Sequence, residues 1–353
     1  MKEKVYLTRT SRDGDYSVNS LRNIIESKNL FDFISEMDMV AIKTHFGEKK
    51  ELGYLKPPFI RMIGELVKEK KAKPFLTETT ALYKGRRNNA VDHIELANDH
   101  GFGYDNTGLP IVMSDGLFGD EETEIDIPGK IQSKVKIASM LEKIQAMIII
   151  SHFTGHMLAG FGAALKNMGM GCSSRKGKMQ QHSSVKPRIK KPKCTKCELC
   201  VKWCPESAIA MEEDSAVIDQ ARCIGCGQCL AVCRFDAVRY NWGASQEEVQ
   251  KNIVEHAWGV ARANENKILY INSLLNISKD CDCMLTYENI SPDIGILISN
   301  DPVAIDAASI DLVEKESGKR LSEIAHNINY RIQIDYAKEI GFGNPDYELI
   351  ETT

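Results

Sequence analysis

The sequence predicts an α/β fold, with an open and mostly parallel sheet covered by helices and a small α+β module inserted into the chain. Short apolar runs, such as residues 146–150, alternate with segments of helical periodicity, which favours parallel strands joined by helices. The same alternation resumes after a cysteine-rich stretch in the second half of the chain. We therefore expect residues 1–185 and 244–353 to share one core, with the module at residues 186–243.

Each expected strand of the α/β domain is a short apolar run, and each expected helix carries apolar residues three or four positions apart. The strands are 5–10, 39–43, 74–76, 146–150, 267–272 and 294–299, and the helices are 18–28, 59–70, 89–100, 247–263 and 303–317. Asp301 and Pro302 stand where the last helix begins, as an N-cap and a first-turn proline would. Residues 173–193 lose all periodicity and are expected to form a basic linker, with Arg175, Lys176 and Lys178 available to face an acidic ligand.

Composition suits a globular protein with one large core and a small module. The chain has 353 residues, of which 43% are apolar and 27% charged. Its net charge of −4 gives no reason to expect nucleic acid or an anionic membrane as a partner. Because no apolar run of about twenty residues and no secretory signal is seen, we expect a cytoplasmic protein without a membrane span.

Two cysteine runs, CTKCELCVKWC from Cys194 and CIGCGQCLAVC from Cys223, share the spacing C-x2-C-x2-C-x3-C. This is the ligand pattern of proteins with two 4Fe–4S clusters, in which the fourth cysteine of each run binds the other cluster. The expected ligand sets are Cys194, Cys197, Cys200 and Cys233 for one cluster, and Cys223, Cys226, Cys229 and Cys204 for the other. Zinc and disulfides are the alternatives, but zinc does not require two sets of four thiols at this interval.

The two runs form an internal repeat. Cys194 and Cys223 are 29 residues apart, and the similarity continues as PESAIAM at 205–211 and RFDAVRY at 234–240. This repeat resembles a bacterial ferredoxin of the two-cluster type. The resemblance implies an electron-transfer module whose partner is a redox donor or acceptor protein.

Polar residues gather where the expected strands end, which is the edge at which open α/β sheets bind ligands. The catalytic candidates are His45, His152 and Lys166, and the candidates for cofactor binding are Lys43, Glu78, His156, Gly160, Gly162 and Asp301. A small-molecule substrate, or an additional flavin, nucleotide or metal ion, would bind among them. Each residue also has a structural interpretation, with the histidines as hydrogen-bonded core residues, Glu78 and Asp301 as helix caps, and the stem of Lys166 packed along its helix.

A glycine-rich segment at 155–171 leads from the strand at 146–150 into a helix of small residues. Its glycines would let the backbone approach a ligand, and the helix N-terminus would offer N–H groups to an anion. Close packing of the helix on the sheet explains the same composition equally well.

Three cysteines remain outside the two runs: Cys172, Cys281 and Cys283. A single free cysteine is often a small buried apolar residue. Two cysteines separated by one aspartate fit a buried core poorly, because they would point the same way and leave the carboxylate on the other side. One hypothesis is that the pair lies beside the module or the strand-end cleft and that Cys172 joins it in a thiol site; the other is that the CDC loop packs against the module.

The motifs KTHFGE at 43–48, HFTGHMLAGFGAALKNMGMGCSSRKGK at 152–178, CDC at 281–283 and DPVAIDAASIDL at 301–312, together with the cysteine runs, resemble the family of the domain of unknown function 362. The resemblance covers most of the chain. It implies iron–sulfur redox proteins with a ferredoxin insertion, and it supplies no substrate. Two classes of function therefore stay open: an oxidoreductase whose α/β domain holds a substrate near the clusters, which the strand-end residues favour, and a ferredoxin-type electron carrier without substrate chemistry of its own.

Overall fold

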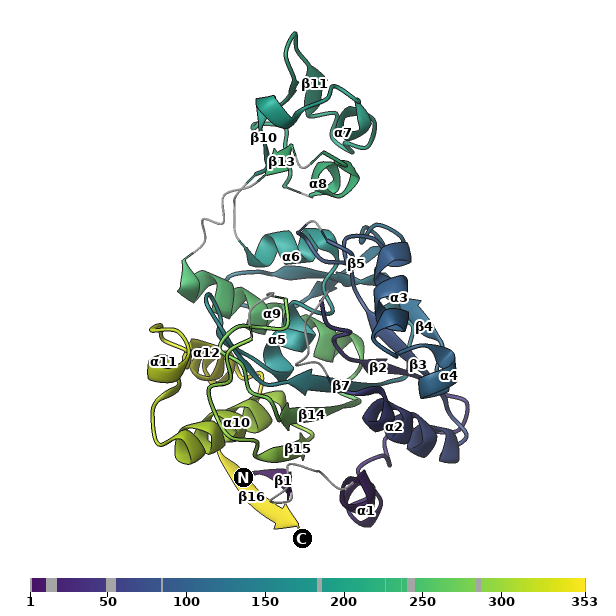
Figure 1. Cartoon of the computed structure of the whole chain (residues 1–353), viewed down its shortest axis with the longest axis vertical. Coiled ribbons are helices and arrows are strands. Elements are labelled where there is room, and N and C mark those ends of the chain that lie inside the picture. The colour runs from purple at the N-terminus through teal and green to yellow at the C-terminus, as the bar shows by residue number, and fades with distance from the viewer. Residues whose placement is uncertain are drawn as a thin grey trace.

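The computed structural model describes residues 2–10, 18–48, 55–83, 85–182, 186–225, 227–235, 237–239, 245–283 and 287–352. Its centre is an eight-stranded sheet with the order β16-β1-β15-β14-β7-β2-β3-β4 (Figure 1). The strands are β1 (Glu3–Arg9), β2 (Met39–Lys43), β3 (Lys73–Glu78), β4 (Ile111–Met113), β7 (Ala146–His152), β14 (Ile268–Leu274), β15 (Gly295–Ser299) and β16 (Tyr347–Thr352). β15 runs antiparallel to β1 and β14, and the other neighbouring pairs are parallel. The α/β class with a mostly parallel sheet is thereby confirmed.

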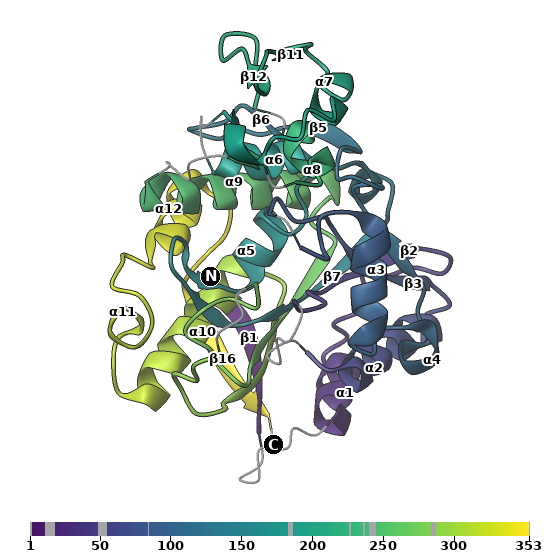
Figure 2. The ribbon, with the colours of Figure 1, turned by 45° about the horizontal axis from the view of Figure 1, so that its top comes forward.

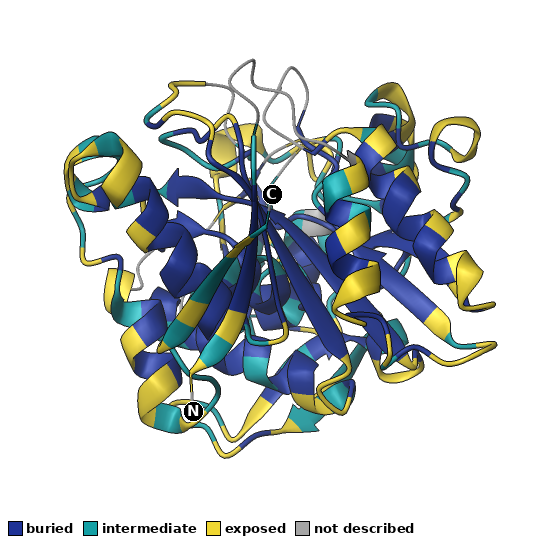
Figure 3. Cartoon of the chain, turned by 90° about the horizontal axis from the view of Figure 1, so that it is seen from below, coloured by how far each residue is buried: buried dark blue, intermediate teal, exposed yellow. Residues whose placement is uncertain are grey.

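Helices cover both faces of the sheet. One face carries α1 (Val18–Ser27), α2 (Pro57–Glu69), α3 (Ala90–Asp99) and α4 (Tyr104–Thr107), and the other carries α5 (Ala164–Gly169), α9 (Gln246–Ala263), α10 (Pro302–Ser317) and α12 (Ile332–Ile340). Strand β7 is buried along its whole length, with Ile148 and Ile150 in the core on the α2 side and Met147 and Ile149 in the core on the α5 side. Figure 3 shows the central strands as buried and the outer turns of the helices as exposed. Burial on both faces is why these strands are continuous apolar runs in the sequence.

The structure confirms the expected strands and helices of the α/β domain to within two residues at each end. Shorter elements fill the weakly patterned regions: the hairpin of β5 (Glu122–Asp126) and β6 (Lys134–Ala138), the hairpin of β8 (Thr154–His156) and β9 (Gly160–Gly162), the 3-10 helix η1 (Ser139–Glu142), and α11 (Leu321–Ile324).

The expectation of a linker over 173–193 is wrong for its first part. Residues Arg175–Gln181 form helix α6, in which the N-cap Ser174 accepts a hydrogen bond from the N–H of Gly177. The helix buries the polar side chains of Arg175, Lys178 and Gln181 against the body of the protein. Because polar side chains face inward, hydrophobic periodicity could not reveal this helix.

Residues 188–239 form two small antiparallel sheets and two short helices. The pairs are β10 (Arg188–Ile189) with β13 (Val238–Arg239) and β11 (Ile209–Met211) with β12 (Ala216–Ile218), accompanied by the 3-10 helix η2 (Lys191–Lys193), α7 (Leu199–Lys202) and α8 (Gln228–Val232). Their small core contains Ile209, Ile218 and Val238 with the cysteines packed around it. In the large sheet, β7, which precedes these residues in the chain, pairs with β14, which follows them.

This unit, which we call the cysteine module, lies against the end of the body that carries α6. In both Figure 1 and Figure 2, α8 is the part of the module next to α6. Trp203 packs edge to face on Phe118 with ring centroids 5.5 Å apart, and Gln228 donates a hydrogen bond of 3.2 Å to Asp120. A side chain at Gly227 would meet Arg175 at 3.4 Å, so the module and α6 are in close contact there.

Candidate functional site

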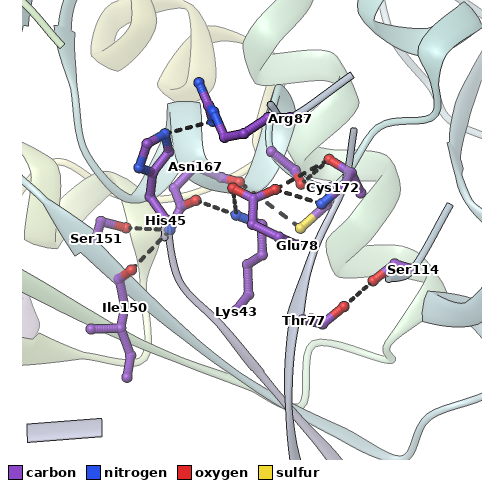
Figure 4. Close-up of polar contacts among 12 residues, drawn as sticks. Lys43, His45, Thr77, Glu78, Arg87, Ser114, Ile150, Ser151, Asn167 and Cys172 are labelled. Atoms are coloured by element: carbon purple, nitrogen blue, oxygen red, sulfur yellow. Dashed lines mark hydrogen bonds and ion pairs between the residues drawn. The ribbon is translucent and has the colours of Figure 1, made fainter. Parts of the chain in front are cut away.

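Three of the expected site residues, Lys43, Glu78 and His152, come from the carboxyl ends of the parallel strands β2, β3 and β7. Lys43 Nζ lies 3.0 Å from Glu78 Oε1 and donates a 2.7 Å hydrogen bond to Asn167 Oδ1 (Figure 4). Asn167 in turn donates to the carbonyl of Ile150. These contacts tie helix α5 to the ends of three strands.

The Lys43–Glu78 pair is almost completely buried, with side-chain exposures of 1% and 5%. Burial alone would raise the pKa of Glu78, but the charge of Lys43, together with His93, His45 and Arg87, outweighs it and lowers that pKa to about 2. Glu78 therefore carries its charge at neutral pH and holds the Lys43 ammonium in place rather than serving as a proton donor.

Two adjoining pockets open at this edge of the sheet. The larger encloses about 590 Å³ of empty space including its mouth, and its polar lining includes His45, Glu78, Arg87, Lys166, Lys178 and Cys283. The second, of about 390 Å³, shares His45, Lys166, Asn167 and Cys283 with the first and adds His152, Cys281 and Gly162. The structure thus brings together His45, Glu78, His152 and Lys166, as expected, with Lys43 directly behind Glu78.

Cations dominate the larger pocket. Arg87 is buried and pairs with Glu48 at 3.1 Å, while its other nitrogens lie 2.7 Å from His45 Nε2 and 3.3 Å from Cys283 Sγ. Lys178 donates to Thr79 Oγ1 and to two carbonyl oxygens, and burial lowers its pKa to about 8. Among the described residues, neither Lys166 nor Lys178 forms a salt bridge with a carboxylate.

The CDC turn brings its two cysteines to the pocket wall. Asp282 points away from them to His152, whose Nδ1 lies 2.9 Å from one carboxylate oxygen. The other ring nitrogen of His152 lies 2.7 Å from the carbonyl oxygen of Leu275. Since both ring nitrogens face acceptors, this geometry suits a doubly protonated imidazolium paired with Asp282. Burial would raise the pKa of Asp282, but His152 outweighs it and lowers the pKa.

Of the two hypotheses for the three free cysteines, the structure supports the cleft for Cys281 and Cys283. Cys172 lines neither pocket. It is fully buried, its Sγ faces the carbonyl of Asn167 at 3.9 Å, and burial raises its pKa to about 12. Cys172 is therefore an inert core thiol, and its expected part in a thiol site is wrong.

Asp301 does not belong to this site, which corrects the expectation of a shared cleft. β15 is antiparallel to its neighbours, so its carboxyl end lies at the opposite edge of the sheet. There Asp301 caps α10 by accepting hydrogen bonds from the N–H groups of Val303 and Ala304, and it also accepts one from Asn344.

Asp301→Ala should therefore cost about 1–2 kcal/mol of unfolding free energy, because an N-cap and one further acceptor are lost. Ligand binding and iron content should not change. Urea unfolding and iron analysis on the same preparation test this. If the variant loses ligand binding while its stability is unchanged, Asp301 belongs to the site.

Of the three other candidates, His156 and Gly160 are structural and Gly162 lines a pocket. His156 turns back on its own hairpin, where Nδ1 accepts from the N–H groups of Leu158 and Ala159. Gly160 has φ of +80° and leaves no room for a side chain, which would meet Tyr330 at 2.5 Å. Gly162 does line the second pocket, beside Lys166.

The N-terminus of α5 is not an anion site. Its N–H groups at Ala164 and Leu165 donate to the two oxygens of Asp306, at 2.9 Å each. Burial raises the pKa of Asp306 to about 7. The protein itself thus occupies the position where the glycine-rich segment suggested a phosphate, and the packing interpretation is correct.

Sequence reasoning missed Arg87 and Asn167 as site residues, and it named Lys178 only as a linker residue that could face an acidic ligand. Arg87 lies on a loop between β3 and α3, and Lys178 lies on the helix taken for a linker. The useful signal was position: Arg87 follows a strand end, and Asn167 stands one residue after the candidate Lys166.

In the cysteine module, the cysteines gather in two groups around two small pockets. One pocket is lined by Cys194, Cys197, Cys200 and Cys233, and the other by Cys204, Cys223 and Cys229. Cys226 lies outside the described residues. Each group thus combines cysteines of one run, three in the first group and two described ones in the second, with the last cysteine of the other run.

The internal repeat extends to the backbone. Lys196 and Glu198 in the first loop and Gly225 and Gly227 in the second have positive φ at equivalent places. Backbone N–H groups point at sulfurs in matching positions as well: Ala208 to Cys204 at 3.2 Å and Ala237 to Cys233 at 3.3 Å. N–H groups directed at thiolate sulfurs are what a bound iron–sulfur cluster requires, so the residues present fit such a cluster.

Comparison with known proteins finds a family that spans most of the chain and relatives that match a shorter part of it. The model of the family described as "Domain of unknown function (DUF362)" matches residues 40–311. The pyruvate synthase subunit PorD of Methanothermobacter marburgensis is 35% identical over 82 residues, 23% of this chain and 94% of that subunit. The formate dehydrogenase-O iron-sulfur subunit of Escherichia coli is 32% identical over 71 residues, 19% of this chain and only 24% of that protein.

Among solved structures, the lactate racemase apoprotein of Thermoanaerobacterium thermosaccharolyticum aligns with 77% of this chain and 51% of its own, at a TM-score of 0.40 and 11% identity. This similarity is too low to inform on function. Within the described part of the chain, no helix combines the length and apolar character needed to cross a membrane. The family model spans most of the chain and the similar subunits are of the ferredoxin type, so this protein belongs to the DUF362 family and carries an iron–sulfur ferredoxin-type module.

Proposed function

We propose that this protein is an oxidoreductase in which two 4Fe–4S clusters pass single electrons to a small molecule bound in the strand-end pocket. When bound, the clusters would supply one-electron chemistry. The observation that carries the proposal is the position of α6, which contacts the cysteine module through Arg175 and lines the larger pocket through Lys178. One seven-residue helix therefore separates the module from the site.

We assign the ligands in crossed sets, as the two pockets of the module support: Cys194, Cys197, Cys200 and Cys233, and Cys204, Cys223, Cys226 and Cys229. We also propose residues 186–243 as an insertion in one α/β domain formed by 1–185 and 244–353, since strands from both flanks form the large sheet.

The second set would be the one closer to the site. Gly227 and Gln228 stand beside Cys229 and contact α6 and Asp120, and Trp203 stands beside Cys204 and packs on Phe118. In the first set, Cys197 is exposed. Electrons would thus enter from a partner protein at the exposed set and leave through the set next to α6. The eight thiolates must stay free to bind iron, which suits a reducing cytoplasm.

The charges of the pocket favour an anionic ligand. Lys43 and Arg87 are each matched by a carboxylate, Glu78 and Glu48, whereas Lys166 and Lys178 lack one among the described residues. Two ammonium groups without a carboxylate, one on the buried Lys178 and one on the partly buried Lys166, would gain most from a carboxylate or phosphate in the ligand. A flavin phosphate, a nucleotide or a small organic acid would each meet this requirement.

Titration of the cluster-loaded protein with candidate anions tests the pocket. We expect at least one carboxylate or phosphate ligand to raise the melting temperature and to reoxidise the reduced clusters faster than buffer does. Lys166→Met should weaken binding at least about tenfold, since a charge-assisted hydrogen bond contributes about 1.5–3 kcal/mol. Lys28→Met, at an exposed position just after α1, is the matched control.

If no anion binds and Lys166→Met leaves electron transfer to partner proteins unchanged, the pocket is not a substrate site. The protein would then be an electron carrier, a function that the exposed Cys197 set alone could support.

A further inference from the structure

We propose that Cys281 and Cys283 form a redox-active dithiol that reduces disulfides of small molecules bearing carboxylates. This inference rests on the proposed function for its supply of electrons. It adds a reacting pair of side chains and a substrate class to the pocket.

The turn that carries the two cysteines is held firmly. Asp282 pairs with His152, and Asp280 pairs with His326 at 2.9 Å. On the underside, Gly155 donates to the carbonyl of Ser278, and a side chain at Gly155 would collide with the carbonyl of Lys279 at 2.2 Å. With its carboxylates bound on the body side, the turn presents both sulfurs to the second pocket. Both cysteines remain partly exposed, so a ligand can reach them.

The surroundings favour one thiol and one thiolate. A hydrogen bond from the Cys281 thiol lowers the pKa of Cys283 well below its ordinary value despite burial, and Arg87, His45 and Lys166 add to the effect. Arg87 Nη2 lies 3.3 Å and His45 Nε2 lies 3.9 Å from Cys283 Sγ. The same hydrogen bond raises the pKa of Cys281. A nucleophilic thiolate beside a protonated thiol is the arrangement in which a dithiol attacks and then resolves a disulfide.

The reaction balances without a further reagent. The Cys283 thiolate attacks one sulfur of the ligand disulfide, the ligand S–S bond breaks, and the first thiolate leaves, to be protonated. Cys281 then loses its proton and attacks Cys283 Sγ, which releases the second thiolate and forms the Cys281–Cys283 disulfide. The ligand gains two electrons and the protein pair loses two. Two electrons from the reduced module and one proton restore the thiol and thiolate.

The cations explain why the ligand should be anionic. Lys166 lines both pockets, and its pKa is raised by the neighbouring Cys281 and Cys283 although burial opposes this. It remains charged and close to the leaving thiolate. A carboxylate on the ligand would be attracted by the cations of the larger pocket, whereas an ammonium group on the ligand would be repelled by them.

Two disulfide probes of similar size and opposite charge test the proposal: 3,3′-dithiodipropionate and cystamine. Anaerobic cluster-loaded protein is mixed with each probe, and cysteine-containing peptides are examined by mass spectrometry. We expect dithiodipropionate to convert the wild-type pair to an internal disulfide at least about ten times faster than cystamine does. Cys281→Ser should trap a mixed disulfide on Cys283, and Cys283→Ser should react with neither probe.

Two variants serve as controls. Cys172→Ala changes a buried thiol outside the pockets and should react like wild type. The exposed Lys319→Gln should keep the preference for the anionic probe. The variant that these controls match, Lys166→Gln, should reduce that preference at least about tenfold. Absence of a mixed disulfide in Cys281→Ser protein with full iron content would overturn the dithiol. Equal rates with the two probes would overturn the anionic substrate class.

A second measurement separates this inference from the proposed function. The internal disulfide is formed first, excess probe is removed, and the clusters are photoreduced; recovery of the two thiols is followed by alkylation. If the pair reacts with the probe but the two thiols are not recovered after photoreduction, the dithiol is supported and electron delivery to the pocket is refuted. If the clusters are reduced normally but Cys281 and Cys283 do not react with the probe, the dithiol is refuted and the proposed function is not.

Discussion

Replacing Cys204 by alanine should leave the protein with about four of the eight iron ions that we propose it binds, and the cluster that disappears should be the one assigned to the second run. The reason is the crossed grouping, in which Cys204 lines a pocket with Cys223 and Cys229 rather than with its neighbours in sequence. Losing one of four thiolates in a partly exposed pocket should prevent stable assembly of that cluster, while the other set stays complete. Iron and sulfide analysis with paramagnetic resonance of the reduced protein measures this.

Paired variants identify the cluster without any assignment of spectra. In the crossed arrangement, Cys204→Ala combined with Cys223→Ala should lose no more iron than either alone, and Cys204→Ala combined with Cys194→Ala should lose both clusters. If instead the pair Cys204 and Cys194 behaves as one unit, each run binds its own cluster. Cys172→Ala should retain all the iron, because its sulfur is buried in the body of the protein.

Lys43→Met should lower the free energy of unfolding by about 3–5 kcal/mol at neutral pH, because it leaves the charge of Glu78 buried without its partner. The ammonium also donates to Asn167, so helix α5 loses one of its ties to the strands. Anaerobic urea unfolding measures the change. Lys70→Met, which removes a partner from the exposed pair Lys70–Asp32, should cost less than about 1 kcal/mol and serves as the control.

The pH dependence of this loss has a definite sign. In the wild type the folded pKa of Glu78 is about 2, below its ordinary value of 4.5, so its contribution to stability is complete above about pH 4.5 and is lost as the pH falls toward 2. Lys43→Met removes the largest of the positive charges that oppose the effect of burial on Glu78, so the folded pKa rises, and the deficit should grow as the pH rises through that value. Unfolding at about pH 8 should therefore show a larger deficit than at about pH 5.5. An equal deficit at both would mean that the buried charge is not its cause.

The sequence by itself determined the features that depend on neighbouring residues. Strands β2 and β7 were evident because burial on both faces makes most of their residues apolar, and helix α2 because its apolar residues recur at helical spacing. Helix α10 was evident from its cap, Asp301 followed by Pro302, and from its apolar composition. The iron–sulfur module was evident for the same reason: a short loop fixes the spacing of its cysteines. Even the backbone conformations repeat at that spacing, with positive φ at Lys196 and Gly225.

Only the tertiary structure decided which polar residues share the site, because that depends on strand direction and on pairing across the fold. Asp301 looked like a strand-end ligand residue, but β15 runs the other way and places it at the opposite edge. Arg87 and Cys283 are 196 residues apart in sequence and 3.3 Å apart in space. No local pattern encodes such a contact, because it arises from the order in which distant strands enter the sheet. Charge balance in the pocket, and with it the chemistry of the thiol pair, follows from that order.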